Sequence, residues 1–316
     1  MTKIKQNYQH IPVLLNEVLE YLRPQQGQNF VDATLGGGGY SRVIISKVGE
    51  KGNVLSIDLD NDAIELAQIL KSKLQISNWT IAQGNFKDLD KILKHHEFPA
   101  PDGIVADLGL SSYELEHRGI SFQTDQPLDM RFDQSQQLDA KYILNSYDQE
   151  RLEKIFNEYG EEKFTRQIAR KIIDFRLKIK EIKHTTDLYE IIKDALPKPV
   201  KHKADDSARR IFQALRIEVN HELSSLEEFL PKSFDLLKPG GRLVVVSFHS
   251  LEDRMVKQFF KKLEQGCVCP PEFPQCLCGE TPKGKILTKK LISASEIELE
   301  KNPRAKPAKL RAIQKL

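Results

Sequence analysis

The residues Phe30-Val-Asp-Ala-Thr-Leu-Gly-Gly-Gly-Gly39 are the strongest indication of the fold of this chain. Residues 30–35 form a short, mostly apolar run that predicts a buried strand, and the glycines predict a tight turn followed by a helix. A strand, a glycine-rich turn and a helix in this order are typical of α/β folds, which bind ligands at the carboxyl ends of their strands. We therefore expect a nucleotide-like ligand at this turn.

Strand-like and helix-like segments alternate around this stretch as far as residue 109. Further strands are expected at 54–59, 79–83 and 104–108, and a helix at 63–74 with Asn61 or Asp62 as its cap. Such alternation predicts an α/β fold with a mostly parallel sheet and right-handed crossovers.

In the middle of the chain the apolar residues recur with a different spacing. Residues 110–215 are polar and helical in period, whereas strand signals return at 242–248 and a helix is expected at 251–263. Closing strands are expected at 286–292 and 310–313. We interpret the middle as a helical insertion (113–213) between two parts of one sheet domain (1–112 and 214–316), because four strands alone leave an unfinished edge. Two sequential domains are the alternative.

The composition is that of a soluble protein, with 40% hydrophobic and 29% charged residues. There is no apolar run long enough to cross a membrane, and the stretch at 11–15 is too short and interrupted to act as a signal peptide. We therefore expect a cytoplasmic location and no membrane partner. The net charge of +3 does not by itself indicate nucleic acid, and the oligomeric state is open, a homodimer included.

Three aspartates separate the ligand classes that such a fold can bind. Asp32, Asp58 and Asp107 fall near the carboxyl ends of predicted strands, where they would repel a pyrophosphate but suit a sulfonium and an α-amino group. Asp58 also stands where a carboxylate can accept the ribose hydroxyls. Arg42 occupies the third position of a dinucleotide fingerprint, which requires a small residue, so a nicotinamide oxidoreductase is disfavoured.

Several residue runs resemble one family, the bacterial 16S ribosomal RNA cytosine-N4 methyltransferases called RsmH or MraW. They are the runs at 10–19, 31–39, 107–112, 118–122, 127–131, 212–217, 247–253 and 302–304. The resemblance implies a Rossmann-like class I methyltransferase fold with an inserted helical substrate-recognition domain. It also implies S-adenosyl-L-methionine as cofactor and, as substrate, a cytidine near the P site in the decoding region of 16S rRNA in the small ribosomal subunit.

The resemblance also implies site residues. The cofactor positions are Gly38, Gly39, Tyr40, Asp58, Phe86, Asp107 and Glu114. Tyr40 and Glu114 stand where family members commonly have His and Gln, and an ionised Glu114 can only accept hydrogen bonds. From its position alone, Phe86 covers an adenine face or fills the core, two interpretations near parity.

Methyl transfer to cytosine N4 depends mainly on positioning, because S-adenosylmethionine is already activated. Our hypothesis is that Asp107 is the catalytic residue, either accepting a hydrogen bond from the amino group or orienting the methionine end of the cofactor. A C5 methyltransferase is unsuited, because the cysteines lie far along the chain from these motifs. A non-catalytic RNA-binding assembly factor is the alternative from another class.

Substrate contacts are expected in a loop with Arg118, Phe122, Asp129 and Arg131, and at His249 after the fifth strand. For each, an ordinary structural role is about equally favoured. Basic residues at 198–210 and 301–311 are candidates for phosphate contacts, although such charge is more often solvated surface. Cys267, Cys269, Cys276 and Cys278 form two Cys-x-Cys pairs that suit either one zinc ion or a free-thiol loop.

Overall fold

The computed structural model describes residues 12–179, 181–266, 269 and 278–316. It divides into two compact units: unit 1 comprises Met1–Gly109 and Ser224–Leu316, and unit 2 comprises Leu110–Leu223. In the sequence, unit 2 thus interrupts unit 1. The boundaries expected at 113 and 213, and the role of the insertion in substrate recognition, stay predictions.

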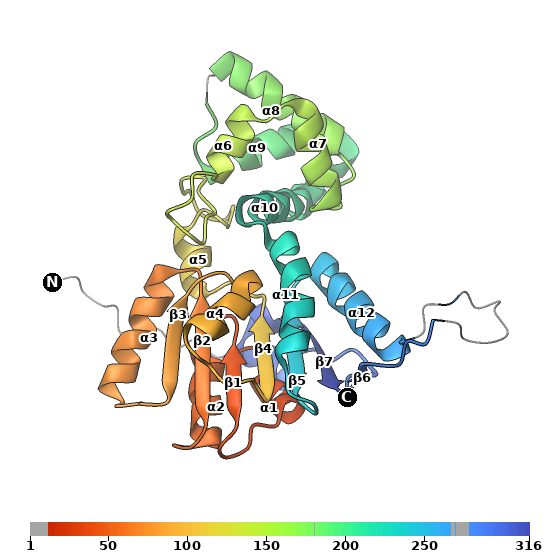
Figure 1. Cartoon of the computed structure of the whole chain (residues 1–316). Coiled ribbons are helices and arrows are strands. Elements are labelled where there is room, and N and C mark those ends of the chain that lie inside the picture. Colours follow the sequence, from red (N-terminus) through yellow and green to blue (C-terminus); the bar gives the residue numbers. More distant parts are fainter. Residues whose placement is uncertain (1–11, 180, 267–268, 270–277) are drawn as a thin grey trace. The chain divides into compact units, whose positions relative to one another are not determined.

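Unit 1 is built on a seven-stranded sheet with the order β3-β2-β1-β4-β5-β7-β6 (Figure 1). The strands are β1 (Asn29–Asp32), β2 (Asn53–Asp58), β3 (Trp79–Gln83), β4 (Gly103–Asp107), β5 (Arg242–Ser247), β6 (Gly284–Ile286) and β7 (Lys309–Lys315). Neighbours among the first five strands pair in parallel, whereas β7 is antiparallel to both β5 and β6. The expected mostly parallel sheet is confirmed.

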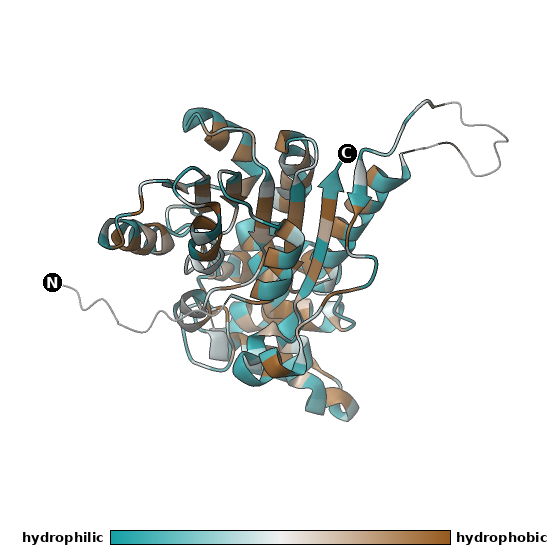
Figure 2. Ribbon diagram, turned by 90° about the horizontal axis from the view of Figure 1, so that it is seen from below, coloured by the Kyte–Doolittle hydropathy of each residue, from teal (hydrophilic) through white to brown (hydrophobic). Residues whose placement is uncertain are grey.

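Helices cover both faces of this sheet. They are α1 (Leu15–Leu22), α2 (Gly39–Val48), α3 (Asn61–Lys73), η1 (Phe86–Asp88), α4 (Leu89–His95), α11 (Glu222–Leu236), α12 (Ser250–Gln265), α13 (Glu296–Lys301) and η3 (Pro303–Ala305). One core cluster joins α1, α2 and α3 to the sheet, and a second joins α4, α11 and α12. Phe30 belongs to the first cluster and Val31 to the second, so the central strands are buried on both faces. These strands carry much of the brown, hydrophobic colour in Figure 2.

In unit 2, the named elements of the described chain are helical. They are α5 (Ser112–His117), α6 (Ala140–Ser146), α7 (Gln149–Glu158), α8 (Thr165–Ile179), α9 (Thr185–Ala195), η2 (Lys198–Lys203) and α10 (Ala204–Asn220). Their apolar faces meet in a core of their own that includes Leu152, Ile168 and Phe212. Across both units, none of the helices that the structure describes has the length and apolar character to span a membrane.

Two local predictions were wrong. The cap of α3 is Asp60, whose carboxylate accepts a hydrogen bond from the Asp62 backbone, rather than Asn61 or Asp62. The strand expected at 286–292 is short: β6 ends at Ile286, and Ile292 forms only an isolated bridge to Leu310. The reason is a side chain, because the hydroxyl of Thr288 accepts the Ala312 N–H in place of a backbone carbonyl.

Candidate functional site

Three aspartates end three neighbouring strands of unit 1. Asp32 is the last residue of β1, Asp58 of β2 and Asp107 of β4, and β1 lies between the other two strands. Asp32 is fully buried and the other two are partly buried. The structure therefore confirms that these carboxylates share the carboxyl edge of the sheet.

The negative charges of the three carboxylates are not balanced by a positively charged side chain among the described residues, and their pKa values are raised. Burial raises the pKa of Asp32 to about 7, and the nearby Asp107 and Asp58 add to the effect. Burial likewise raises the pKa of Asp58 to about 6 and that of Asp107 to about 6. Among the described residues, no lysine or arginine forms an ion pair with any of them. An edge with several buried acids and no cation suits a positively charged ligand.

Asp32 is held by a chain of buried hydroxyls that sequence reasoning missed. Ser41 Oγ on α2 donates to Asp32 Oδ2 at 2.5 Å and lies 2.7 Å from Ser56 Oγ, which accepts from Trp79 Nε1 at 2.8 Å. The chain fixes the carboxylate against the start of α2. In the sequence, the one indication of this hydroxyl chain is Ser56, a polar residue within the apolar strand β2.

Asp58 organises the glycine turn. Its Oδ2 accepts the Gly36 N–H at 2.8 Å, and its Oδ1 accepts the Asp60 N–H at 2.9 Å. The turn needs glycine at Gly38, where φ is +70°, and at Gly39, where an added Cβ would lie 2.2 Å from Cγ of Pro12. Both oxygens of Asp58 keep acceptor capacity, so the expected ribose contact stays a prediction.

Tyr40 is buried beside Asp107. Its hydroxyl donates to the Val13 carbonyl, and a hydrogen bond with Tyr40 partly offsets the burial that raises the pKa of Asp107. Burial and the Asp107 charge in turn raise the pKa of Tyr40 well above its ordinary value. A phenol has one proton, so Tyr40 can donate to only one of these two acceptors at a time.

Asp107 itself is anchored by the backbone around it. Its N–H donates to Thr34 Oγ1 at 2.7 Å, and its Oδ1 accepts the Gly109 N–H at 3.0 Å. A Cβ on Gly109 would lie 2.7 Å from the ring of Phe248 and 2.9 Å from Asp107 Oδ1. The exits of β4 and β5 therefore pack closely, and a residue larger than glycine would displace the carboxylate.

His249 follows β5 at the start of α12 and is nearly buried. Its Nε2 lies 3.0 Å from Glu252 Oε1, an ion-pair distance without hydrogen-bond alignment, and within the described part of the chain neither ring nitrogen has a hydrogen-bond partner. Glu252 also accepts the backbone N–H groups of Phe248 and His249, at 2.8 and 3.2 Å. Its charge contributes to the raised pKa of Asp107. Sequence reasoning missed Glu252, although its place three residues after the helix cap indicates a capping role.

Phe86 begins η1, after β3, and is partly buried. Its ring packs edge-on against Phe229, with 5.1 Å between centroids, at the margin of the core cluster of α4, α11 and α12. The core-filling role is therefore observed, and the adenine contact stays a prediction.

The other expected cofactor residue, Glu114, lies in unit 2. Ser111 Oγ accepts the Glu114 N–H at 3.1 Å, and Glu114 Oε2 accepts the Ser111 N–H at 2.6 Å, so the two residues form a capping box at the start of α5. This bond needs only an acceptor, which the carboxylate supplies, and the expected contact of Glu114 with the cofactor stays a prediction.

The expected substrate loop is tightly folded within unit 2. Arg131 donates to both oxygens of Asp129, at 2.7 and 2.9 Å, and also to the Gln136 carbonyl. Although burial acts in the opposite direction, these bonds hold the pKa of Asp129 below its ordinary value. Phe122 stacks on Tyr189 with 5.4 Å between centroids. The Arg118 carbonyl accepts the Met130 N–H at 2.7 Å, which ties the ends of the loop together.

Several of the basic phosphate candidates are paired with acids. Arg210 contacts Glu162 at 2.7 Å in unit 2, and Arg311 contacts both oxygens of Asp253 in unit 1, at 2.7 and 3.1 Å. These two arginines have structural partners. Cys267 and Cys276 lie outside the described residues, so the zinc hypothesis stays a prediction.

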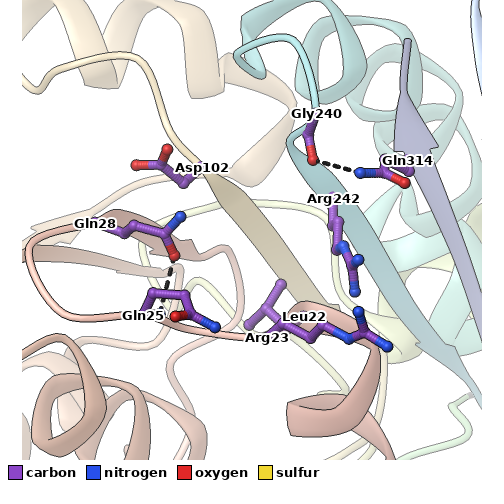
Figure 3. Close-up of a pocket in the computed structure, with 8 residues that line it drawn as sticks. All are labelled: Leu22, Arg23, Gln25, Gln28, Asp102, Gly240, Arg242 and Gln314. Carbon is purple, nitrogen blue, oxygen red and sulfur yellow. Dashed lines mark hydrogen bonds between the residues drawn. The ribbon is translucent and has the colours of Figure 1, made fainter.

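A pocket lies at the opposite, amino edge of the same sheet (Figure 3). Its lining residues precede or begin β1, β4 and β5 and include Gln28, Asp102 and Arg242, with Gln314 from β7. Because α/β sheets bind their ligands at the carboxyl edge, this pocket is separate from the aspartate site.

Comparison with known proteins identifies the family of this chain. The model of the MraW methylase family matches residues 7–316. The chain is 46% identical over 313 residues to a protein from Syntrophotalea carbinolica named ribosomal RNA small subunit methyltransferase H, covering 98% of both chains. A protein of the same name from Halothermothrix orenii is 44% identical over 310 residues, covering 98% of this chain and 99% of the relative. These matches decide against a nicotinamide oxidoreductase, and the chain belongs to the MraW methylase family.

Proposed function

We propose that this methyltransferase uses S-adenosyl-L-methionine to methylate N4 of a cytidine near the P site, in the decoding region of 16S rRNA in the small ribosomal subunit. The observation that carries the proposal is the sheet edge where Asp32 is fully buried, Asp58 and Asp107 are partly buried, and no lysine or arginine of the described residues is paired with them. Support for the RNA comes from the relatives, which are named small-subunit ribosomal RNA methyltransferases. The nitrogen atom is inferred from the motifs that the chain shares with the cytosine-N4 methyltransferases.

The aspartate edge fits the cofactor by charge. S-adenosylmethionine carries a methyl group on a positively charged sulfur, together with a free ammonium group. Asp32, Asp58 and Asp107 offer negative charge at the point where the glycine turn lets a ligand approach the backbone. Ionised carboxylates that are costly to bury alone become favourable beside a cation.

Asp107 is the residue we assign to the amino group of the base. Its pKa of about 6 keeps it largely ionised at neutral pH, and its Oδ1 is directed by the Gly109 N–H. A carboxylate that accepts an N4 proton localises the lone pair of the amino nitrogen, which is otherwise delocalised into the ring. His249 follows the neighbouring strand β5, and we assign it a contact to the substrate.

Unit 2 is the part of the chain we assign to RNA recognition. Its loop is pre-formed by the Asp129–Arg131 pair, and Phe122 contributes one face of an aromatic stack. Aromatic rings and guanidinium planes suit a base that has left its stack.

The test is a methylation assay with isotopically labelled S-adenosylmethionine. Small subunits from a strain without this modification and naked 16S rRNA would each be incubated with the protein. One portion of the RNA would be digested to nucleosides, which identifies the methylated atom, and another to oligonucleotides, which locates its position, both for mass spectrometry. We expect the label in N4-methylated cytidine at a single decoding-region position. Label at another atom or another position would contradict the proposal.

A further inference from the structure

The backbone of residues 12–14, here called the N-terminal strap, lies on the glycine turn of the aspartate site. A Cβ on Gly39 would lie 2.2 Å from Cγ of Pro12, so the ring of Pro12 rests directly on the glycine backbone. The Tyr40 hydroxyl donates to the Val13 carbonyl one residue further on. The strap therefore contacts two of the residues expected to bind the cofactor.

The far end of the chain holds this strap in place. The Leu14 N–H donates to Glu298 Oε1 at 2.7 Å, a bond between residues 284 positions apart. Glu298 is itself fixed in α13, because its N–H donates to Ser295 Oγ at 3.2 Å and its carbonyl accepts the Asn302 N–H at 2.7 Å. Its charge also contributes to the raised pKa of Tyr40, which places it near the same site.

The conformation of the strap needs such a partner. Leu14 is fully buried with φ at +54°, in the left-handed region that a leucine rarely adopts. It is the residue that precedes α1, and no side chain from that position caps the helix. A carboxylate from elsewhere supplies the acceptor and also places negative charge at the amino end of α1.

We propose that Glu298 is a positioning residue for the cofactor site, acting through its hydrogen bond to Leu14. It keeps the strap against Gly39 and Tyr40, so the affinity for S-adenosylmethionine depends on a side chain in the C-terminal part of the chain. The inference rests on cofactor binding at the aspartate edge, and it is independent of which RNA atom receives the methyl group.

The test compares Glu298→Ala, Glu298→Gln and the control Glu300→Ala, a change at an exposed position on the same helix. Dissociation constants for S-adenosylmethionine would come from calorimetry and from the fluorescence of Trp79. Trp79 is the single tryptophan, and its ring lies 3.6 Å from where a Cβ on Gly38 would be. We expect Glu298→Ala to weaken binding about tenfold, equivalent to about 1.4 kcal/mol. Glu298→Gln keeps the acceptor oxygen, so it and Glu300→Ala are expected to stay within about twofold of the parent protein.

The same variants separate positioning from a general loss of structure. In the methylation assay we expect Glu298→Ala to raise KM for S-adenosylmethionine while kcat at saturation stays within about twofold, because Glu298 touches no reacting group. Should Glu298→Ala fail to fold, Glu298→Asp, whose shorter side chain cannot reach Leu14, replaces it with the same expectation.

Either of two results would overturn the inference: unchanged cofactor affinity in the alanine variant, or a glutamine variant as weak as the alanine variant. Failure of the proposed function would look different, because then the parent protein would bind S-adenosylmethionine but place the methyl group elsewhere.

Discussion

The pKa values of the sheet-edge aspartates in unit 1 and of Asp129 in the unit 2 loop shift in opposite directions. At the sheet edge of unit 1, burial raises the pKa of Asp32 to about 7. In the loop of unit 2, Asp129 is half-buried, and although this burial acts to raise its pKa, two hydrogen bonds from Arg131 hold the pKa below the ordinary value. This contrast shows that burial of a carboxylate alone does not indicate a ligand site. A ligand site is indicated where the protein leaves a buried charge without an oppositely charged partner, because a ligand can then supply that partner.

The largest expected effect tests whether the unit 1 edge is catalytic. Replacing Asp107 by Asn keeps the size and polarity of the side chain but removes the charge that accepts a proton from the amino group. We expect kcat to fall by roughly 100-fold or more, with the melting temperature close to that of the parent protein. The exposed Asp235→Asn is the matched control, measured in the same assay. Near-normal turnover of Asp107→Asn would remove this residue from the mechanism.

A second test uses pH to titrate the edge. The pKa values of about 7, 6 and 6 for Asp32, Asp58 and Asp107 mean that these groups lose their protons between about pH 5 and pH 8. A cation binds the ionised forms, so its affinity rises with pH across this window. We expect the dissociation constant for S-adenosylmethionine to fall by about tenfold or more from pH 5.5 to pH 8, with proton release on binding. A flat profile by calorimetry would mean that the carboxylates are not used in this way.

A third test compares how Asp32→Asn in unit 1 and Asp129→Asn in unit 2 change the free energy of unfolding. The pKa of Asp32 is raised on folding, so its ionisation costs stability as the pH rises from about 4 to 7, and Asp32→Asn is expected to stabilise the ligand-free protein at pH 8. The pKa of Asp129 is lowered, so its contribution is present above its unfolded pKa and is lost in acid. Asp129→Asn is expected to destabilise the protein at pH 8. Each change should be on the order of 1 kcal/mol in denaturant unfolding. If both variants changed the free energy of unfolding in the same direction, the two carboxylates would not differ in the way that we infer.

The smallest expected effect concerns Glu252. Its charge helps to raise the pKa of Asp107, and the amide of Glu252→Gln retains an acceptor for the Phe248 N–H. We therefore expect the acidic midpoint of the kcat profile to move to lower pH, by less than about one unit. A midpoint that moves upward would show that Glu252 acts on a different group.

Much of unit 1 was predictable because its signals are local. The run at 30–39 predicted β1, the turn and α2, and β3 was predicted with its observed bounds. The three aspartates were predicted at one edge because parallel strands end on the same side of a sheet. The short β6 was not predictable, because Thr288 takes over a ladder hydrogen bond only once β7 lies beside it.

The α/β architecture, the position of the cofactor edge and the family could be inferred from the sequence, because apolar period, glycine placement and motifs are properties of neighbouring residues. Which carboxylates have a positively charged partner depends on the three-dimensional packing of the chain. Asp129 is paired with Arg131, whereas Asp32 accepts hydrogen bonds from Ser41 Oγ and the Thr34 N–H and has no cation beside it among the described residues. Glu298 meets Leu14 across 284 positions. The contact of Glu298 with Leu14 and the hydroxyl chain from Ser41 to Trp79 depend on how separate segments pack, and no local pattern encodes them.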